Sequence, residues 1–149
     1  EVIWEKDFTV YANDRVDGGI LASPVLGKEG TSMAGLIIYN ITYEVSGDSS
    51  TSRLVALDKL TGEIVWEYDM DVTGWSPASP VPVYTEDGQG YIVQCDRGGD
   101  IVLLRVDGQT VEEAAKINVE DNFEATPVVY ENMIVVGSRK DHFFYIEMG

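Results

Sequence analysis

Three short acidic segments contain the residue types of this 149-residue chain that are best suited to binding chemistry. Their carboxylates and amides are oxygen ligands for a cation, although they lack the close alternation of acids found in a calcium-binding loop. Aromatic side chains among polar groups are also typical of recognition surfaces. We therefore predict a binding face made of Asp14, Arg15 and Asp17 in the first segment, Asp71, Thr73 and Trp75 in the second, and Asp121, Asn122 and Phe123 in the third. Trp75 has no strand pattern to bury it and is a candidate contact residue, whereas Phe123 is expected to pack inward.

Residues suited to catalysis are sparse. His142 is the only histidine, so a zinc site or a Ser-His-Asp triad would depend on one residue in a polar turn. Cys95 is the only cysteine, which excludes an internal disulfide. It alternates with Tyr91 and Val93 in a strand pattern, which predicts a buried structural thiol. We expect no catalytic residue and no metal site.

The charge balance restricts the class of partner. There are 26 acidic residues against 10 basic ones, a formal net charge of −16. Such a chain repels nucleic acid and anionic membrane surfaces, so we expect no nucleic-acid binding. No apolar run reaches the ~18 residues that a membrane-spanning helix needs. The charge either keeps the protein in solution or attracts cations and basic partners.

The binding segments must be positioned by β-strands. Short β-rich runs alternate with clusters of Gly, Asp and Ser, which is typical of hairpins, and only 111–116 has helix-friendly composition. The Ser-rich segment 46–52 is expected to be a mobile loop tip. The clearest strands are 35–43, 53–57, 64–68, 91–95, 101–106, 133–137 and 143–148.

An internal repeat organises these strands. The segment Ala-Ser-Pro-Val at 22–25 recurs at 78–81, and again as Ala-Thr-Pro-Val at 125–128. A turn, an apolar strand, a second turn and a second apolar strand follow each copy. This order predicts an all-β fold, a β-propeller with about three four-stranded antiparallel blades.

The first repeat ends in a corner at 57–62. Asp58 stands at the end of a strand, where its carboxylate can accept hydrogen bonds from N–H groups of the following turn. The hydroxyl of Thr61 can close the same turn from its other side, and Gly62 can adopt the positive φ that reverses the chain. We assign all three a structural role.

The repeats predict a single propeller segment over 1–149. Its parts are an outer strand of an incomplete blade at 1–10, a first blade at 20–70, a second at 76–119, and three strands of a third at 123–149. The outer strand is inferred because 1–5 resembles 63–67 position for position. Unpaired strand edges are a liability unless they are covered. Two explanations remain open. The chain is a fragment of a longer propeller, or two copies complete each other's blades and each forms half of a six-bladed dimer.

The segment 54–66 resembles the signature of the quinoprotein-like (PQQ-like) β-propeller repeat, a member of the WD40/YVTN-like propellers. The signature is an apolar strand with Ala-Leu-Asp, here ending at Asp58, a turn with Thr61 and Gly62, and a strand that carries a tryptophan, here Trp66. The second repeat has Val111 where the signature has glycine. The resemblance implies a radial array of blades with tryptophans packed between neighbours, so that Trp4 and Trp66 are structural.

Families with this repeat include quinone-dependent dehydrogenases, a lipoprotein of outer-membrane protein assembly and exported proteins without known activity. The resemblance implies an extracytoplasmic protein, whether periplasmic, secreted or on the cell surface. We predict a non-catalytic module that binds or scaffolds a protein or ligand, with self-association through open blade edges as a further possibility. The alternative is part of a PQQ-dependent dehydrogenase-like enzyme completed by further blades, the only setting in which we expect PQQ or Ca²⁺.

Overall fold

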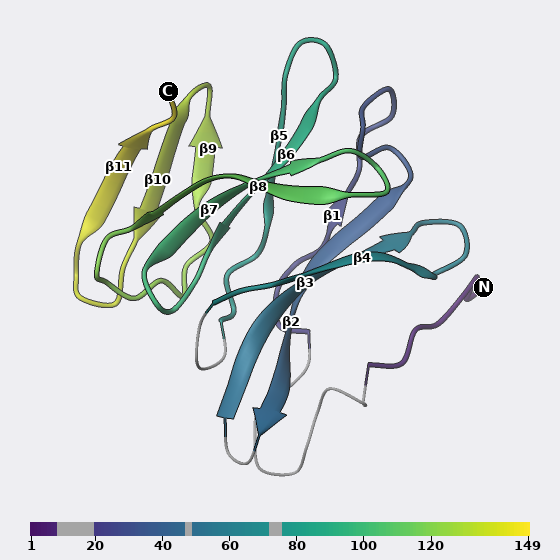
Figure 1. Ribbon diagram of the computed structural model, residues 1–149, viewed down its shortest axis with the longest axis horizontal. Coiled ribbons are helices and arrows are strands. Elements are labelled where there is room, and N and C mark those ends of the chain that lie inside the picture. Colours follow the sequence, from purple (N-terminus) through teal and green to yellow (C-terminus); the bar gives the residue numbers. More distant parts are fainter. Residues whose placement is uncertain (9–19, 47–48, 72–75) are drawn as a thin grey trace.

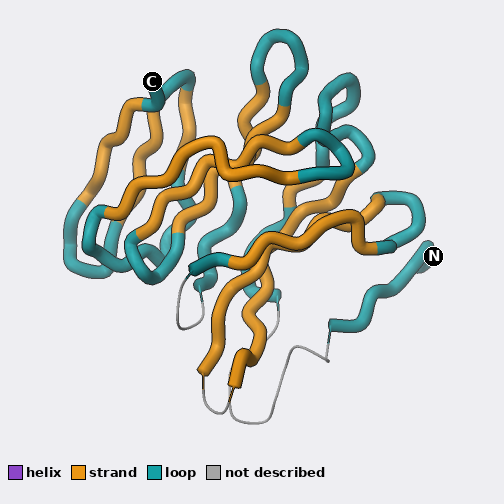
Figure 2. The backbone as a smooth tube through the Cα atoms, in the orientation of Figure 1, coloured by secondary structure: helices purple, strands orange, loops and turns teal. Residues whose placement is uncertain are grey.

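The computed structural model describes residues 1–8, 20–46, 49–71 and 76–149. These residues form eleven strands joined by turns and loops, and they contain no helix (Figures 1 and 2). The all-β prediction is therefore confirmed. A helix that could cross a membrane is absent from these residues.

The first sheet is an antiparallel meander in the order β1-β2-β3-β4. Its strands are β1 (Val25–Leu26), β2 (Leu36–Ser46), β3 (Ser49–Asp58) and β4 (Ile64–Asp69). The prediction of a loop over 46–52 is wrong for most of that segment, because Ser52 pairs with Thr42 and is fully buried. The hydroxyl of the buried Thr51 donates to the carbonyl of Met70 at 3.0 Å, whereas the buried Ser52 hydroxyl has no hydrogen-bond partner.

The second and third sheets repeat this arrangement. The second is β5-β6-β7-β8, with strands β5 (Val81–Tyr84), β6 (Gly90–Cys95), β7 (Asp100–Val106) and β8 (Val111–Asn118). The helix-friendly residues 111–116 thus lie in a strand, as the repeat predicts. The third sheet has three strands in the order β11-β10-β9: β9 (Val128–Tyr130), β10 (Met133–Gly137) and β11 (Phe143–Glu147).

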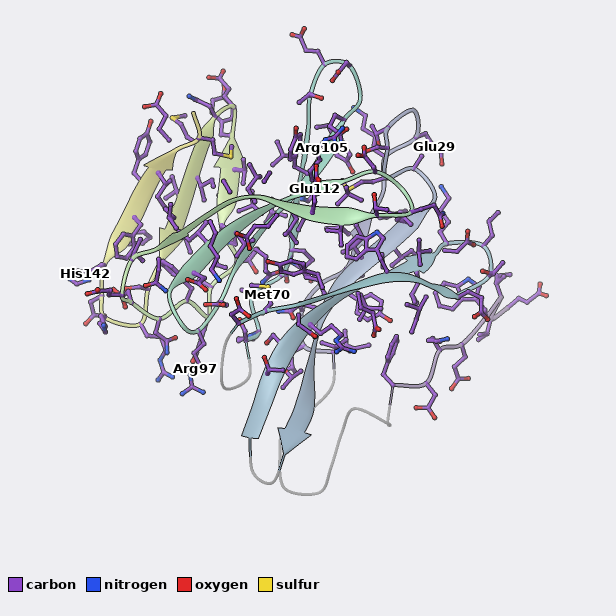
Figure 3. All side chains as sticks on the ribbon, in the orientation of Figure 1. Glu29, Met70, Arg97, Arg105, Glu112 and His142 are labelled. Carbon is purple, nitrogen blue, oxygen red and sulfur yellow. The ribbon has the colours of Figure 1, made fainter. Side chains whose placement is uncertain are left out.

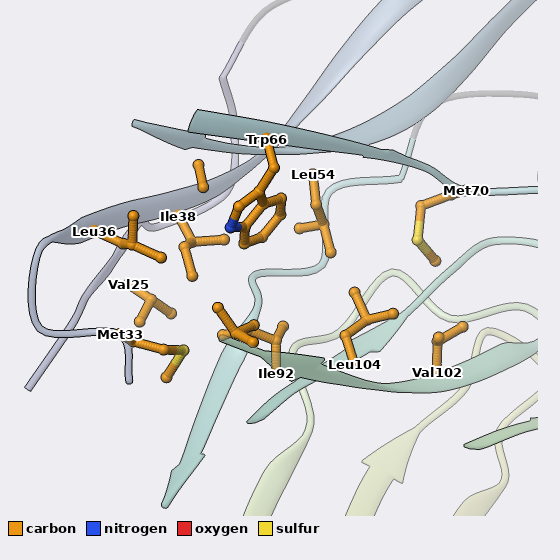
Figure 4. Packing of buried hydrophobic residues seen from close by; sticks show 12 residues of the cluster. Val25, Met33, Leu36, Ile38, Leu54, Trp66, Met70, Ile92, Val102 and Leu104 are labelled. Carbon is orange, nitrogen blue, oxygen red and sulfur yellow. The ribbon is translucent and has the colours of Figure 1, made fainter. Parts of the chain in front are cut away.

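The three sheets pack face to face in chain order. Between the first and second sheets, Leu54 and Trp66 pack against Ile92 and Leu104 (Figure 4). Between the second and third sheets, Val93 packs with residues of β10. Both faces of β6 are therefore buried, which accounts for its nearly continuous apolar sequence. Each such side chain stabilises the fold by ~1.5–3 kcal/mol.

The corner after β3 forms as the sequence predicts. Oδ1 of Asp58 accepts hydrogen bonds from the backbone N–H groups of Leu60 and Thr61, both at 2.9 Å, and from the Thr61 hydroxyl at 3.1 Å. The Thr61 hydroxyl also accepts from the N–H of Glu63. Gly62 has a φ of 72°. The N–H groups of Thr61 and Leu60 lower the pKa of Asp58, because they stabilise its ionised form.

Residues 1–8 lie on the outer face of the first sheet, away from the second sheet. The indole N–H of Trp4 donates to the carbonyl of Lys59 at 3.1 Å, and the ring lies over Gly62. Phe8 packs edge-on against Tyr39, with ring centroids 5.5 Å apart. Residues 1–8 form no ladder with a described strand, so the outer strand of an incomplete blade predicted for 1–10 stays a prediction.

Candidate functional site

The connections that follow β4 and β8 lie at the same edge of the stack as the β6–β7 and β10–β11 turns. We call this edge, formed by residues 71, 76–80, 96–99, 119–127 and 138–142, the connection edge. The N–H of Val119 donates to the carbonyl of Gly99 at 3.1 Å, and the N–H of Arg139 donates to the carbonyl of Asn122 at 2.9 Å. Figure 3 places Arg97 and His142 at this edge and Arg105 at the opposite one.

Asp121 joins the second sheet to the third. It follows β8, and its Oδ2 lies 3.1 Å from Nδ1 of His142 in the β10–β11 turn. Burial of the Asp121 carboxyl raises its pKa, but the His142 hydrogen bond and the N–H of Asn122 outweigh this effect, so the pKa lies below its usual value. The carboxylate is thus committed to a contact between sheets.

Asp71 makes the equivalent contact between the first and second sheets. It follows β4, and its Oδ2 lies 3.4 Å from Nζ of Lys116 on β8. The same ammonium group lies 2.7 Å from Oδ2 of Asp100, whose other oxygen accepts from the amide of Asn118 at 2.6 Å. The Asp100 hydrogen bond raises the pKa of Lys116, so this ammonium group stays charged. Two predicted binding acids therefore act first as links between neighbouring sheets.

The remaining predicted binding residues have different positions. Phe123 packs inward, as expected: its ring is fully buried between the second and third sheets, 5.6 Å from the Phe144 ring. Asn122 is half-buried, and its side-chain oxygen has no hydrogen-bond partner. The others, namely Asp14, Arg15, Asp17, Thr73 and Trp75, lie outside the described residues.

Asp96 belongs to the connection edge but is missing from the predicted site. It is fully buried, and its Oδ1 accepts from the N–H groups of Gly98 at 2.8 Å and Asp100 at 3.0 Å. Burial raises its pKa, and these N–H groups only partly oppose the shift. Oδ2 of Asp96 has no hydrogen-bond partner. An aspartate that lies two residues before a pair of glycines reads as a solvated turn residue, so the sequence contains no signal of its burial.

The recurring Ser-Pro segment has a role that the sequence did not reveal. The N–H of Ser23 donates to the hydroxyl of Ser79 at 2.8 Å, and the N–H of Ser79 donates to the hydroxyl of Thr126 at 2.9 Å. These residues precede the first strand of each sheet. The repeated hydroxyl therefore forms a ladder that ties the sheets together, and its recurrence at one position was the available signal.

Cys95 and His142, the residues considered for catalysis, lie in surroundings that give them a role in packing and in sheet contacts. Cys95 is fully buried, and burial raises the pKa of its thiol to about 12. His142 is paired with Asp121 as described. Among the residues that the structure describes, no three His, Cys, Asp or Glu side chains are grouped so that they could hold a metal ion.

No family model matches the chain. A search of curated proteins likewise finds no matching relative.

Proposed function

We propose that this chain is a segment of a PQQ-like β-propeller, displayed outside the cytoplasm, that acts as a non-catalytic binding or scaffolding module. The single observation that carries the proposal is the repeated link between sheets. Each described connection leaves the last strand of one sheet, passes along the same edge and contributes an acid to the next sheet. A stack built in this way gathers its connections on one surface, as a radial array of blades does.

The corner contacts support the propeller arrangement. Trp4 lies over Gly62 and donates to Lys59, while Trp66, at the equivalent place in the repeat, is buried between the first and second sheets. Packing of the repeated tryptophans between neighbouring blades is what the resemblance implies.

The connection edge carries side chains that suit a charged protein surface. Asp71 and Glu120 are exposed on the connections, and Arg139 and Lys140 are exposed in the β10–β11 turn. A partner with alternating charges could pair with this edge, and pairs at a solvated rim contribute more to specificity and rate of association than to affinity.

The quinone-dependent alternative gains no support from the part of the chain that the structure describes. Its calcium ion would need free carboxylates, whereas Asp71 and Asp121 each face a basic side chain. Lys116 carries a positive charge that opposes a second cation beside Asp71.

The test is capture of partners from an extract of the source organism by the immobilised chain and by charge-reversal variants. Glu120→Lys combined with Asp141→Lys changes exposed acids of the connection edge and keeps the Asp71–Lys116 link. Glu86→Lys combined with Glu131→Lys changes exposed acids of the opposite edge by the same charge and serves as the control. We expect the first pair to lose a partner that the second pair retains. Identical capture by both pairs would refute the assignment of the binding surface to the connection edge.

A further inference from the structure

The third sheet leaves a notch beside β11. The notch has a volume of about 170 Å³ and is lined by Leu103, Ala115 and Ile117 of the second sheet and by Ile146 of the third. On the other face of the second sheet, the corresponding place is filled by β4, whose Tyr68 hydroxyl donates to Glu113 of β8 at 2.7 Å. The notch is therefore the space that a fourth strand of the third sheet would occupy, next to the free edge of β11.

Residues 1–6 have the properties of this missing strand. Glu-Val-Ile-Trp-Glu at 1–5 resembles Glu-Ile-Val-Trp-Glu at 63–67, and the latter supplies β4, the fourth strand of the first sheet. The side chains of Val2 and Ile3 are 79% and 78% exposed, and neither residue pairs with a described strand. Within one chain the N-terminal segment and β11 lie on opposite sides of the stack (Figure 1), so the segment cannot fill its own notch.

We propose that two copies of this chain exchange residues 1–6, each copy adding a fourth strand to β11 of the other. The contact is isologous, because the same segment and the same edge are used in both directions. It goes beyond the binding surface proposed above by naming a second copy as the partner of the open edges.

The register of the exchanged strand follows from the two complete sheets. Both have a register shift at the same place, and there Ala56 faces Trp66 and Leu103 faces Ala115. Equivalent hydrogen bonds close the turns before β7 and β11: the N–H of Asp96 donates to the carbonyl of Asp100, and the N–H of Ser138 donates to the carbonyl of His142. Asp100 and His142 therefore occupy the same position, and Tyr145 is the counterpart of Leu103. Trp4 of the second copy therefore faces Tyr145, Val2 faces Ile146, and Lys6 faces Phe143.

The existing contacts of Trp4 are compatible with this exchange. In this register its ring lies on the outer face of the third sheet that it joins, the face that also carries Phe143 and Tyr145, which are 86% and 66% exposed. From there the ring can keep its contact with Gly62 of its own chain. Trp4 would then be buried between the two copies, as Trp66 is buried between the first and second sheets.

The hydroxyl ladder continues across the same junction. It runs from Ser23 to Ser79 to Thr126, and its two ends are the Ser23 hydroxyl and the Thr126 N–H. A groove of about 420 Å³ lies beside Thr126 on the outer face of the third sheet, lined by Val128, Val135 and Phe143. A first sheet of the second copy seated there would bring its Ser23 hydroxyl to the Thr126 N–H.

The first test is the mass of the chain in solution, measured by sedimentation or light scattering over a range of concentrations. We expect a dimer that Ile3→Ser weakens by roughly tenfold or more, because the counterpart of Ile3 in the first sheet, Val65, packs in the apolar cluster between two sheets and both copies lose this packing. Tyr145→Lys, at the receiving edge, should weaken it as well. Leu60→Ser is the control, because Leu60 is equally exposed but lies in the β3–β4 turn.

The second test fixes the register. The variant with Val2→Cys and Ile146→Cys should form a disulfide between copies under mild oxidation, while the buried Cys95 stays reduced. The variant with Val2→Cys and Leu60→Cys is the control and should not. A single-chain mass at every concentration, a dimer that Ile3→Ser leaves unchanged, or a disulfide within one chain would each overturn the exchange. None of these results bears on partner capture at the connection edge.

Discussion

Substitution of Gly62 by alanine tests how the N-terminal segment is held on the first sheet. A Cβ at this position would lie 2.8 Å from Cε3 and 2.9 Å from Cδ2 of the Trp4 ring, too close for the ring to stay in place. The backbone φ of 72° adds a cost of ~1–2 kcal/mol for a residue with a side chain. The alanine lowers the entropy of the unfolded chain, which offsets ~0.4–1 kcal/mol of this cost.

Two other glycines separate these contributions. Gly30 has a φ of 77° and nothing within 4 Å of its virtual Cβ, so Gly30→Ala measures the backbone cost alone, which we place at about 1 kcal/mol. Gly35 has neither a positive φ nor a close neighbour, and Gly35→Ala should stay within ~0.5 kcal/mol of the original chain. Gly62→Ala should cost about 3 kcal/mol, because it also displaces Trp4 from its hydrogen bond to Lys59 and from part of its burial.

Urea unfolding of the three variants provides the measurement, since the unfolding midpoint follows the free energy of unfolding at constant slope. Limited proteolysis should also cleave residues 1–8 faster in Gly62→Ala than in Gly30→Ala. In a Trp4→Ala background the cost of Gly62→Ala should fall to that of Gly30→Ala. If Gly62→Ala and Gly30→Ala cost the same in the original chain, Trp4 does not rest on Gly62 and the explanation is wrong.

Three further predictions concern buried or turn-forming groups. Cys95 should not react with a thiol reagent at neutral pH until the protein unfolds, because its thiol is buried and its pKa is raised to about 12; rapid labelling of the native protein would contradict this. The pKa of Asp58 is lower in the folded than in the unfolded state, so the ionised carboxylate stabilises the fold above about pH 4 and loses that effect as the pH falls. The unfolding midpoint of Asp58→Asn should therefore decline less on acidification than that of the original chain. For Asp96 the pH dependence of stability has the opposite sign, because its raised pKa makes the ionised form unfavourable in the folded protein. Asp96→Asn should therefore be most favourable relative to the original chain at neutral pH and lose this advantage as the pH falls. Asp96→Ala should cost ~1–3 kcal/mol, because the turn N–H groups lose their acceptor.

The strands could be predicted from the sequence because their signals are local. Alternation of apolar residues and turn residues placed β6 and β7 within one residue of their observed bounds. The same reasoning misjudged 49–52, where three serines and a threonine read as a loop although their backbone continues the ladder with β2. Local polarity indicates where a side chain can face water, and it does not show where backbone pairing stops.

The site was harder to predict because its contacts are long-range. The acids Asp71 and Asp121 were expected to be available to a ligand, but their basic partners lie 45 and 21 residues further along the chain. Lys116 occurs in a segment that reads only as the last strand of a repeat. Nothing in the local pattern specifies that this strand packs beside the preceding connection.

The first and second corners hold a tryptophan with different residues at the same repeat position. At the first corner Gly62 lets the Trp4 ring lie against the backbone, and the indole N–H finds the Lys59 carbonyl. At the second corner Val111 takes the place of Gly62 and packs in the same apolar cluster as Trp66, whose indole N–H is buried without a partner. An unpaired buried donor costs ~1–3 kcal/mol, while burying ~150–250 Å² of aromatic surface at about 25 cal/mol per Å² contributes ~4–6 kcal/mol. Apolar packing therefore exceeds the cost of the lost hydrogen bond, which is why the second corner can dispense with glycine and still hold its tryptophan between two sheets.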